Sequence, residues 1–407
     1  MPDQTSDKKD HPPTLLEVLF NAIDTVARRV SDVMPLGRGI RDAMSSHHTG
    51  IIDWTSVRQI AIATLEMSGD KPAPASQKLV DQYQVMLRAA NREVVKETGL
   101  KEQGLPERVD VFSQPDWVDA NIVTFRFLFD PISDKYAAVM SEAGRDGQGM
   151  NRFASGMLTV QVGVIIGYLA RNVLGQFDLS LPEPHAGGKL YIVEPNVKRI
   201  EQQMGMDPTE FRQWIVLHEA THSFEFSASP WLRGYLVDSM REYLASIDWR
   251  GMSSPDFFKK MRQQQKQQPD EDDALKAGGL ISIVSTPEQR RILAKIQATM
   301  SVLEGFSNHV MDMTGSRLLE TYPEMKERFD RRRDNKSAAE KLFQRLIGLN
   351  LKMDQYRIGQ QFVDFVVAHE DIQFMNKVWQ SQTTMPTMEE LRQPELWIAR
   401  IKLPRIG

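Results

Sequence analysis

The chain has 407 residues, of which 41% are hydrophobic and 26% charged, as is typical of a globular protein with a large core. A net charge of −4 and a pI of about 6.1 give no indication of binding to nucleic acid or to an anionic membrane. The absence of cysteine excludes disulfides, thiolate metal sites and cysteine nucleophiles, so any transition metal must be held by histidine, aspartate or glutamate.

Residues 14–148 are predicted to form a helical N-terminal part. Residues 1–13 have no apolar stretch after their basic residues, so we expect a disordered lead-in rather than a signal peptide, and a cytoplasmic protein. The charge-free run 153–170 is short for a membrane span and is interrupted by polar residues, so a buried core helix is expected there. Helical periodicity predicts helices over 14–34, 51–68, 74–98, 115–142 and 150–174.

The clearest strand candidate is KLYIVEPNV, residues 189–197, which alternates apolar side chains between two glycines and a proline. A sharp helix start follows. Asp207 is a good N-cap, Pro208 suits the first helical position and Glu210 completes a capping box, so a helix should continue to about Phe226. Many helices around one clear strand predict a mainly helical fold with a small β-sheet, an α+β class.

A second well-marked helix begins at the cap Thr286 and should continue to about Gly315. The segment 263–279 before it is polar and charged, as is typical of an exposed loop, and the basic run 326–336 is predicted to be a solvated helix end rather than a nucleic-acid site. Further helices are expected from about 337, over 354–369 and over 388–401.

The predicted helix that begins after Asp207 carries the sequence HEATH, residues 218–222. His218 and His222 are four residues apart and therefore share a face, with Cβ atoms about 5–6 Å apart, so that both imidazoles can reach one ion. Glu219 lies about 100° round the helix, where it can take a proton from a water molecule beside the metal. The alternative is a buried helix whose two histidines bond to the backbone or to carboxylates. The glutamate between them favours a Zn²⁺ site.

The third ligand is not found next to this motif. A nearby third histidine or aspartate would stand at 228, where the chain has Ala228, while Glu225 could ligate only with strain. Glu304 is a better candidate, because it is a carboxylate on an otherwise apolar stripe of the second marked helix, and burying it without a partner would be costly. The alternative is that Glu304 pairs with an arginine or lysine at an interface.

Several residues near Glu304 are predicted to assist. Asn308 and Asp312 follow at four and eight residues and are expected to hydrogen-bond a ligand imidazole. His309 is a rival third ligand, although it points about 140° away from Glu304, so both should not bind one ion. His309 and Tyr356 are also candidates for stabilising an oxyanion.

Six motifs stand out between about 150 and 402: EPNV (194–197), LHEATHSFEF (217–226), PWLRGYL (230–236), LEGFSNHVMD (303–312), QYRIGQQFVDFVV (355–367) and PELWIARI (394–401). Together they resemble a family of zincin-like hydrolases of unknown function, some of them labelled as associated with deazaflavin-coenzyme biosynthesis. The resemblance implies a zincin-like catalytic part over 149–402, with gluzincin-type zinc binding by His218, His222 and Glu304. Nothing in the residues indicates deazaflavin chemistry.

One departure from the family pattern is notable. Members tend to read E-G-H-A-D where this chain reads EGFSN, residues 304–308. The metal ligand is kept, but the carboxylate expected to support a ligand histidine becomes the amide of Asn308.

These features predict zinc-dependent hydrolysis of an amide, in a peptide or protein substrate, with Glu219 as general base. The strand at 189–193 could offer its edge to an extended peptide, or it could be an internal strand of the sheet. The alternative functions are a catalytically inactive or structural zinc protein that acts as a binding scaffold, and a metal-free scaffold. Glu219 argues against a purely structural site, which has no use for a base.

Overall fold

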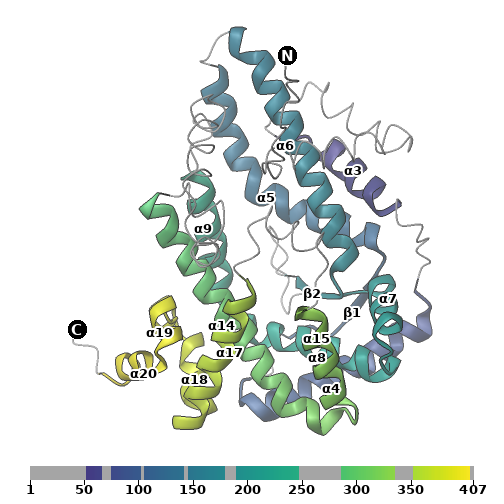
Figure 1. Ribbon diagram of the computed structural model, residues 1–407, viewed down its shortest axis with the longest axis vertical. Helices are drawn as coiled ribbons and strands as arrows, with labels where there is room; N and C mark the ends of the chain where they lie inside the picture. Colours follow the sequence, from purple (N-terminus) through teal and green to yellow (C-terminus); the bar gives the residue numbers. More distant parts are fainter. Residues whose placement is uncertain are drawn as a thin grey trace, which may run out of the picture. The chain divides into compact units, whose positions relative to one another are not determined.

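The computed structural model describes residues 52–66, 75–101, 105–141, 145–178, 189–246, 286–334 and 352–403 (Figure 1). Two compact units divide them: one takes its residues from the segments 1–71 and 137–169, and the other from 72–136 and 170–407. The predicted lead-in 1–13, the helix 14–34, the loop 263–279 and the start of the helix near 337 lie outside the described residues. The predicted division at 148/149 stays a prediction.

The first unit contains α3 (Trp54–Glu66) and most of α6 (Arg145–Asn172). The backbone N–H of Asp53, just before α3, donates to the hydroxyl of Thr159 on α6 over 3.0 Å. The charge-free run 153–170 lies within α6, and in the part of the chain that the structure describes no helix has the length and apolar character needed to cross a bilayer.

The second unit contains a small three-stranded sheet of order β1-β3-β2, formed by β1 (Val109–Phe112), β2 (Gly175–Asp178) and β3 (Lys189–Val193). β1 is parallel to β3 and β2 is antiparallel to it. β3 is therefore the central strand and has partners on both sides, so the expectation that its edge binds a peptide is wrong and the internal-strand alternative holds. The mainly helical α+β class is confirmed.

The predicted strand 189–197 is too long at its C-terminal end. β3 stops at Val193, and α7 (Glu194–Met204) begins immediately after it. Pro195 occupies the first turn of α7, where a missing N–H costs nothing, whereas in a central strand it would remove a ladder hydrogen bond.

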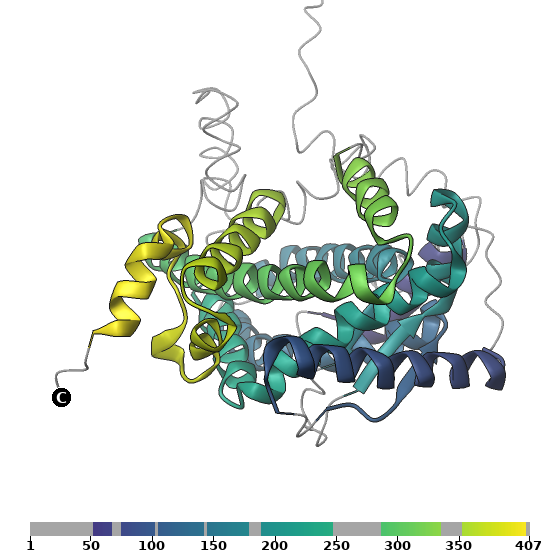
Figure 2. The same ribbon diagram turned by 90° about the horizontal axis from the view of Figure 1, so that it is seen from below.

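Four long helices surround the centre of the second unit: α4 (Gln77–Thr98), α8 (Pro208–Ala228), α14 (Pro287–Leu318) and α17 (Lys352–His369). α4 and α14 both pack against α8, and α17 crosses α14 on its other side, as Figure 2 shows. In the part of α5 (Gln114–Ser141) that belongs to the second unit, Trp117 and Asn121 bind Gln176 of β2 and so attach the helix to the sheet.

The predicted starts of α8 and α14 are confirmed, because the expected residues cap both helices. Asp207 accepts from the backbone N–H groups of Thr209 and Glu210, and Thr286 forms a capping box with Gln289. Glu210 does not close the predicted capping box, because its carboxylate accepts from Thr321 at the start of α15. The other α-helices among the described residues are α9 (Leu232–Ala245), α15 (Tyr322–Asp334), α18 (Ile372–Met375), α19 (Met388–Arg392) and α20 (Pro394–Lys402).

The crossing of α14 and α17 is unusually close because each helix presents a glycine. A Cβ on Gly359 would lie 1.8 Å from the carbonyl oxygen of Ser301, and one on Gly305 would lie 2.2 Å from the carbonyl carbon of Gly359. Both contacts are with backbone, which cannot move aside as a flexible side chain can. Since Gly305 directly follows Glu304, this crossing fixes where α14 presents that carboxylate.

We predict that Gly359→Ala destabilises the protein by about 1–3 kcal/mol or more, because the added methyl group would overlap the α14 backbone. Chemical denaturation would measure the loss. Gly234→Ala in α9 is the matched control, since a Cβ there meets no atom within 4 Å, and replacing a helical glycine by alanine should stabilise by up to about 1 kcal/mol. Equal effects of the two substitutions would contradict the close crossing.

Candidate metal centre

The structure brings together the three side chains predicted as metal ligands, from two helices. His218 and His222 lie one turn apart on α8, and Glu304 faces them from α14. One ligand atom from each residue can be chosen so that all three lie within 4.8 Å of one another. The two histidine Nε2 atoms are 3.2 Å apart, and Nε2 of His218 is 4.0 Å from Oε2 of Glu304.

This donor set fits zinc. Bonds of about 2.0–2.1 Å and tetrahedral angles place two ligand atoms roughly 3.3 Å apart, close to the separation of the two Nε2 atoms. The side chains of His218, His222 and Glu304 keep 24%, 15% and 21% of their surface exposed, so solvent reaches all three. A catalytic site needs such access, because water and substrate must reach the metal.

Each histidine is held through its other ring nitrogen. Nδ1 of His222 is 2.8 Å from Oε2 of Glu225, and Nδ1 of His218 is 3.0 Å from the hydroxyl of Ser307 on α14. If both Nδ1 atoms donate in these bonds, both Nε2 atoms present lone pairs toward the same point. Such supporting bonds fix the orientation of a ligand histidine and raise its basicity.

The predicted supporting residues on α14 are placed differently. Asp312 accepts from Lys326, Tyr322 and Gln360, and so belongs to a network that joins α14 to α15 and α17. Eight residues from Glu304 correspond to about 12 Å along a helix, which is too far for contact with a ligand imidazole. The hydrogen bond predicted for Asn308 is made by its neighbour Ser307 instead.

Glu225 was considered as a strained third ligand, and the structure assigns it another place. It lies three residues after His222 and contacts Nδ1 of that imidazole, and its side chain is fully buried. Its second oxygen, Oε1, is buried without a hydrogen-bond partner among the described residues. Burial raises the pKa of Glu225 to about 7, although His222 opposes this.

Glu219 lies between the cluster and the sheet. Its Oε2 accepts from the backbone N–H of Phe177 on β2 over 2.9 Å. Burial raises the pKa of Glu219 to about 7, against the lowering effects of His222 and of the Phe177 hydrogen bond. A Cβ on Gly175 would lie 2.7 Å from Cγ of Glu219, so a glycine at this point of β2 is what lets the carboxylate fit against the strand.

The electrostatics of the cluster favour a cation. Burial, together with the charge of the neighbouring His222, lowers the pKa of His218 to about 3. Burial also acts to lower the pKa of His222, but Glu225, Glu304 and Glu219 outweigh it and raise that pKa to about 10. Three carboxylates therefore stabilise positive charge at this point, and a divalent ion satisfies them better than a single proton on His222.

His309 does not join the cluster. Its Nδ1 is 2.7 Å from Oδ1 of Asp364 on α17, which places the ring on the α17 side of α14, as expected for a residue about 140° round the helix from Glu304. Among the described residues, the metal-ligand grouping consists of His218, His222 and Glu304 without it. The side chain of Tyr356 lies outside the described residues, so its part in catalysis stays a prediction.

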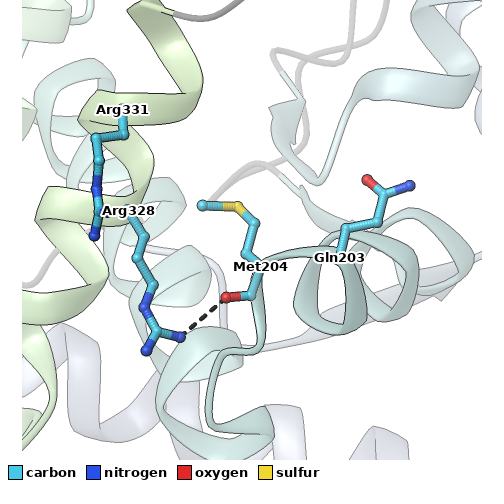
Figure 3. Close-up of a pocket in the computed structure, with 4 residues that line it drawn as sticks. All are labelled: Gln203, Met204, Arg328 and Arg331. Atoms are coloured by element: carbon cyan, nitrogen blue, oxygen red, sulfur yellow. Dashed lines mark hydrogen bonds between the residues drawn. The ribbon is translucent and has the colours of Figure 1, made fainter.

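A cavity of about 630 Å³ lies elsewhere, between the end of α7 and α15 (Figure 3). Of the described residues, Gln203, Met204, Arg328 and Arg331 line it, and none of the candidate ligands does. Arg328 donates to the carbonyl oxygen of Met204 and to that of Gly205, so its guanidinium caps the C-terminus of α7. We therefore interpret this arginine as structural.

We predict that Glu225→Gln weakens zinc binding by about 10- to 100-fold, because the amide can still accept from His222 but no longer carries the charge that raises the basicity of the imidazole. Titration against a competing chelator would measure the affinity. Glu210→Gln is the matched control on the same helix, since Glu210 contacts Thr321 and no ligand. An unchanged affinity in Glu225→Gln would show that Glu225 does not support His222.

Comparison with known proteins identifies the family of this chain. The sequence pattern of a family described as zincin-like metallopeptidases matches residues 52–398. A crystal structure from Chloroflexus aurantiacus, described as "a putative hydrolase with a novel fold", is 35% identical and superposes with a TM-score of 0.64, over 88% of this chain and 100% of that one. Among curated proteins no match is found. The chain therefore belongs to the zincin-like metallopeptidase family.

Proposed function

We propose that the protein is a zinc-dependent peptidase, with zinc held by His218, His222 and Glu304 and with Glu219 as general base. Membership of the family and the likeness to the Chloroflexus aurantiacus protein support a zinc hydrolase at the family level. The observation that carries the finer proposal is the position of Glu219, a buried carboxylate held by the N–H of Phe177 beside a histidine–histidine–glutamate cluster.

Zinc bound at this cluster would supply Lewis-acid chemistry, which acidifies water and polarises the substrate carbonyl. Glu219 then performs the proton transfers. It accepts a proton from the attacking water and donates it to the leaving amine, so its charge is restored after each turnover. A pKa near 7 suits a group that both takes and returns a proton at neutral pH, and the positive charge of a nearby metal would keep it ionised before attack.

The sequence suggested β3 as a peptide-binding edge, but β3 is internal, so we propose that an extended substrate lies along β2 instead. β2 is an outer strand of the described sheet, and the N–H of Phe177 points away from β3 because it reaches Glu219. Because Glu219 already accepts from the Phe177 N–H, an extended peptide that lies along β2 would run beside the base without pairing with that N–H. The sheet thus aligns the substrate with the same element that holds Glu219.

A structural zinc protein is the alternative. A closed structural site has four protein ligands and excludes water. The described cluster has three candidate ligands, and the side chain of each is partly exposed to solvent. A buried base next to an open three-ligand cluster favours catalysis.

We predict one zinc ion per chain in protein from zinc-replete medium, and loss of that zinc in Glu304→Gln, since an amide is a poor zinc ligand. Elemental analysis would measure both. Free zinc at 100 times its dissociation constant should raise the free energy of unfolding by about 2.7 kcal/mol, and a chelator should reverse the gain. Asp312→Asn is the control and should keep its zinc, because Asp312 bonds to Lys326. A wild-type protein without stoichiometric zinc would refute the metal site.

We predict that Glu219→Gln keeps its zinc but loses about 10²- to 10⁴-fold or more in kcat, the range usual for removal of a general base. Turnover of a fluorogenic peptide library and zinc content would be measured on the same preparation. Normal turnover in this variant would exclude Glu219 as the base. Wild-type protein that binds zinc and cleaves no peptide would favour the scaffold alternative.

A further inference from the structure

One face of α8 carries a stripe of partly exposed residues along an otherwise buried segment of the helix. From Ile215 to Glu225, His218 and His222 are the residues that are not fully buried. The stripe continues at the same four-residue spacing to Trp214 before the histidines and to Phe226 after them, and both rings are half-buried. The two candidate ligands thus lie between two aromatic residues on one face of α8.

A second aromatic ring packs against the aromatic residue at each end of this stripe. Before the histidines, the Trp214 ring stacks on Phe329 of α15 with centroids 4.3 Å apart, and it lies nearly parallel to the imidazole of His218 at 6.3 Å. After them, Phe226 packs against Phe177 of β2 with centroids 5.7 Å apart. Besides α8, two other elements contribute to the two pairs, α15 and β2, and all four rings are half-buried.

The second pair is tied directly to the reacting groups. The backbone N–H of Phe177 holds the carboxylate of Glu219, so the Phe177 ring belongs to the residue that positions the base. Twelve residues separate Trp214 from Phe226, which is about 18 Å along a helix. An extended peptide covers that length with roughly five residues, so one substrate can contact both aromatic pairs while its central bond lies at the cluster.

The negative charge of the region limits which substrate side chains can bind next to the aromatic pairs. Glu219, Glu225 and Glu304 surround the histidines and together carry more charge than one divalent ion compensates, so an acidic side chain in a neighbouring subsite would meet net like charge. Half-exposed aromatic rings gain most by covering apolar or aromatic surface, which removes both partners from water. Large apolar side chains are the class that this arrangement recognises.

We propose that the site selects peptides with large apolar side chains, above all aromatic ones, on both sides of the scissile bond. Trp214 with Phe329 forms one subsite, and Phe226 with Phe177 forms the other. The proposal rests on the zinc peptidase function proposed above and names its substrate class and its specificity-determining residues.

The test uses the full-length zinc-loaded protein and two kinds of probe. Hydroxamates of N-acylated phenylalanine, alanine and aspartate bind through zinc and place one side chain beside it, and calorimetry gives their dissociation constants without any turnover. The phenylalanine compound should bind roughly 10- to 100-fold more tightly than the alanine compound, with aspartate weakest. A positional-scanning library of quenched peptides should show the same order in kcat/KM at the residues flanking the cleaved bond.

Substitutions then assign the preference to the rings. Trp214→Ser and Phe226→Ser should each cut the phenylalanine-to-alanine ratio by about tenfold at one flanking position, in the library or with the hydroxamates. Phe329→Ser removes the partner ring of Trp214 from a different helix and should have the same effect on the ratio. It replaces Trp214→Ser as the test if Trp214→Ser folds poorly. Phe365→Ser is the matched control, because Phe365 is a half-buried ring on α17 that stacks on His369, and its ratio should stay at the wild-type value.

The outcomes separate the two proposals. Hydroxamates that bind with equal affinity whatever their side chain, or a preference that survives loss of Trp214, Phe329 and Phe226, would overturn the subsites while leaving the zinc peptidase intact. Protein that holds no zinc and binds no hydroxamate would overturn the proposed function, and the subsites with it. Glu219-dependent cleavage that prefers acidic or small flanking residues would overturn the subsites alone.

Discussion

The candidate centre depends on one close approach between helices, which brings the carboxylate of Glu304 on α14 to within 4.0 Å of an imidazole on α8. Two histidines on a single helix supply only two ligands, and the third must come from an element that tertiary packing holds still. The glycines at the crossing of α14 and α17 meet that need, because Gly305 and Gly359 let the two backbones touch one residue away from Glu304. A rigid position matters, since zinc tolerates only small deviations in its ligand distances.

The carboxylates around the site illustrate how environment divides one chemical group into several roles. Glu304 is partly exposed and faces the histidine nitrogens, Glu225 is fully buried beside His222, and Glu219 is held against β2 by the N–H of Phe177. Placing three carboxylates close together, two of them buried, is unfavourable unless positive charge compensates them. This cost is the physical reason why the site favours a bound cation. It is also why a metal-free scaffold is a poor explanation of the same residues.

The sheet has a larger part in the site than its size suggests. Its outer strand β2 has four residues, yet it provides the N–H that holds the base, the glycine that makes room for it and the ring of Phe177. Strands this short carry too little alternation to be recognised along the chain, and β2 was not predicted. β1 was missed for the same reason, although long helices such as α4 and α14, with their marked caps, were predicted to within a few residues of their observed ends.

Local sequence determined the parts of this protein that depend on neighbours along the chain: the helices, their caps, the shared face of His218 and His222, and the absence of a third ligand close by. It also pointed to Glu304, because a carboxylate on an apolar stripe requires a partner. Only the tertiary structure decided which partner each group has. The support of His218 by Ser307 rather than Asn308, the place of Glu225 beside His222 and the contact of Glu219 with β2 depend on helix rotation and on pairing between distant segments. Shifts of one residue or about 100° change those contacts, and no local pattern specifies them to that accuracy.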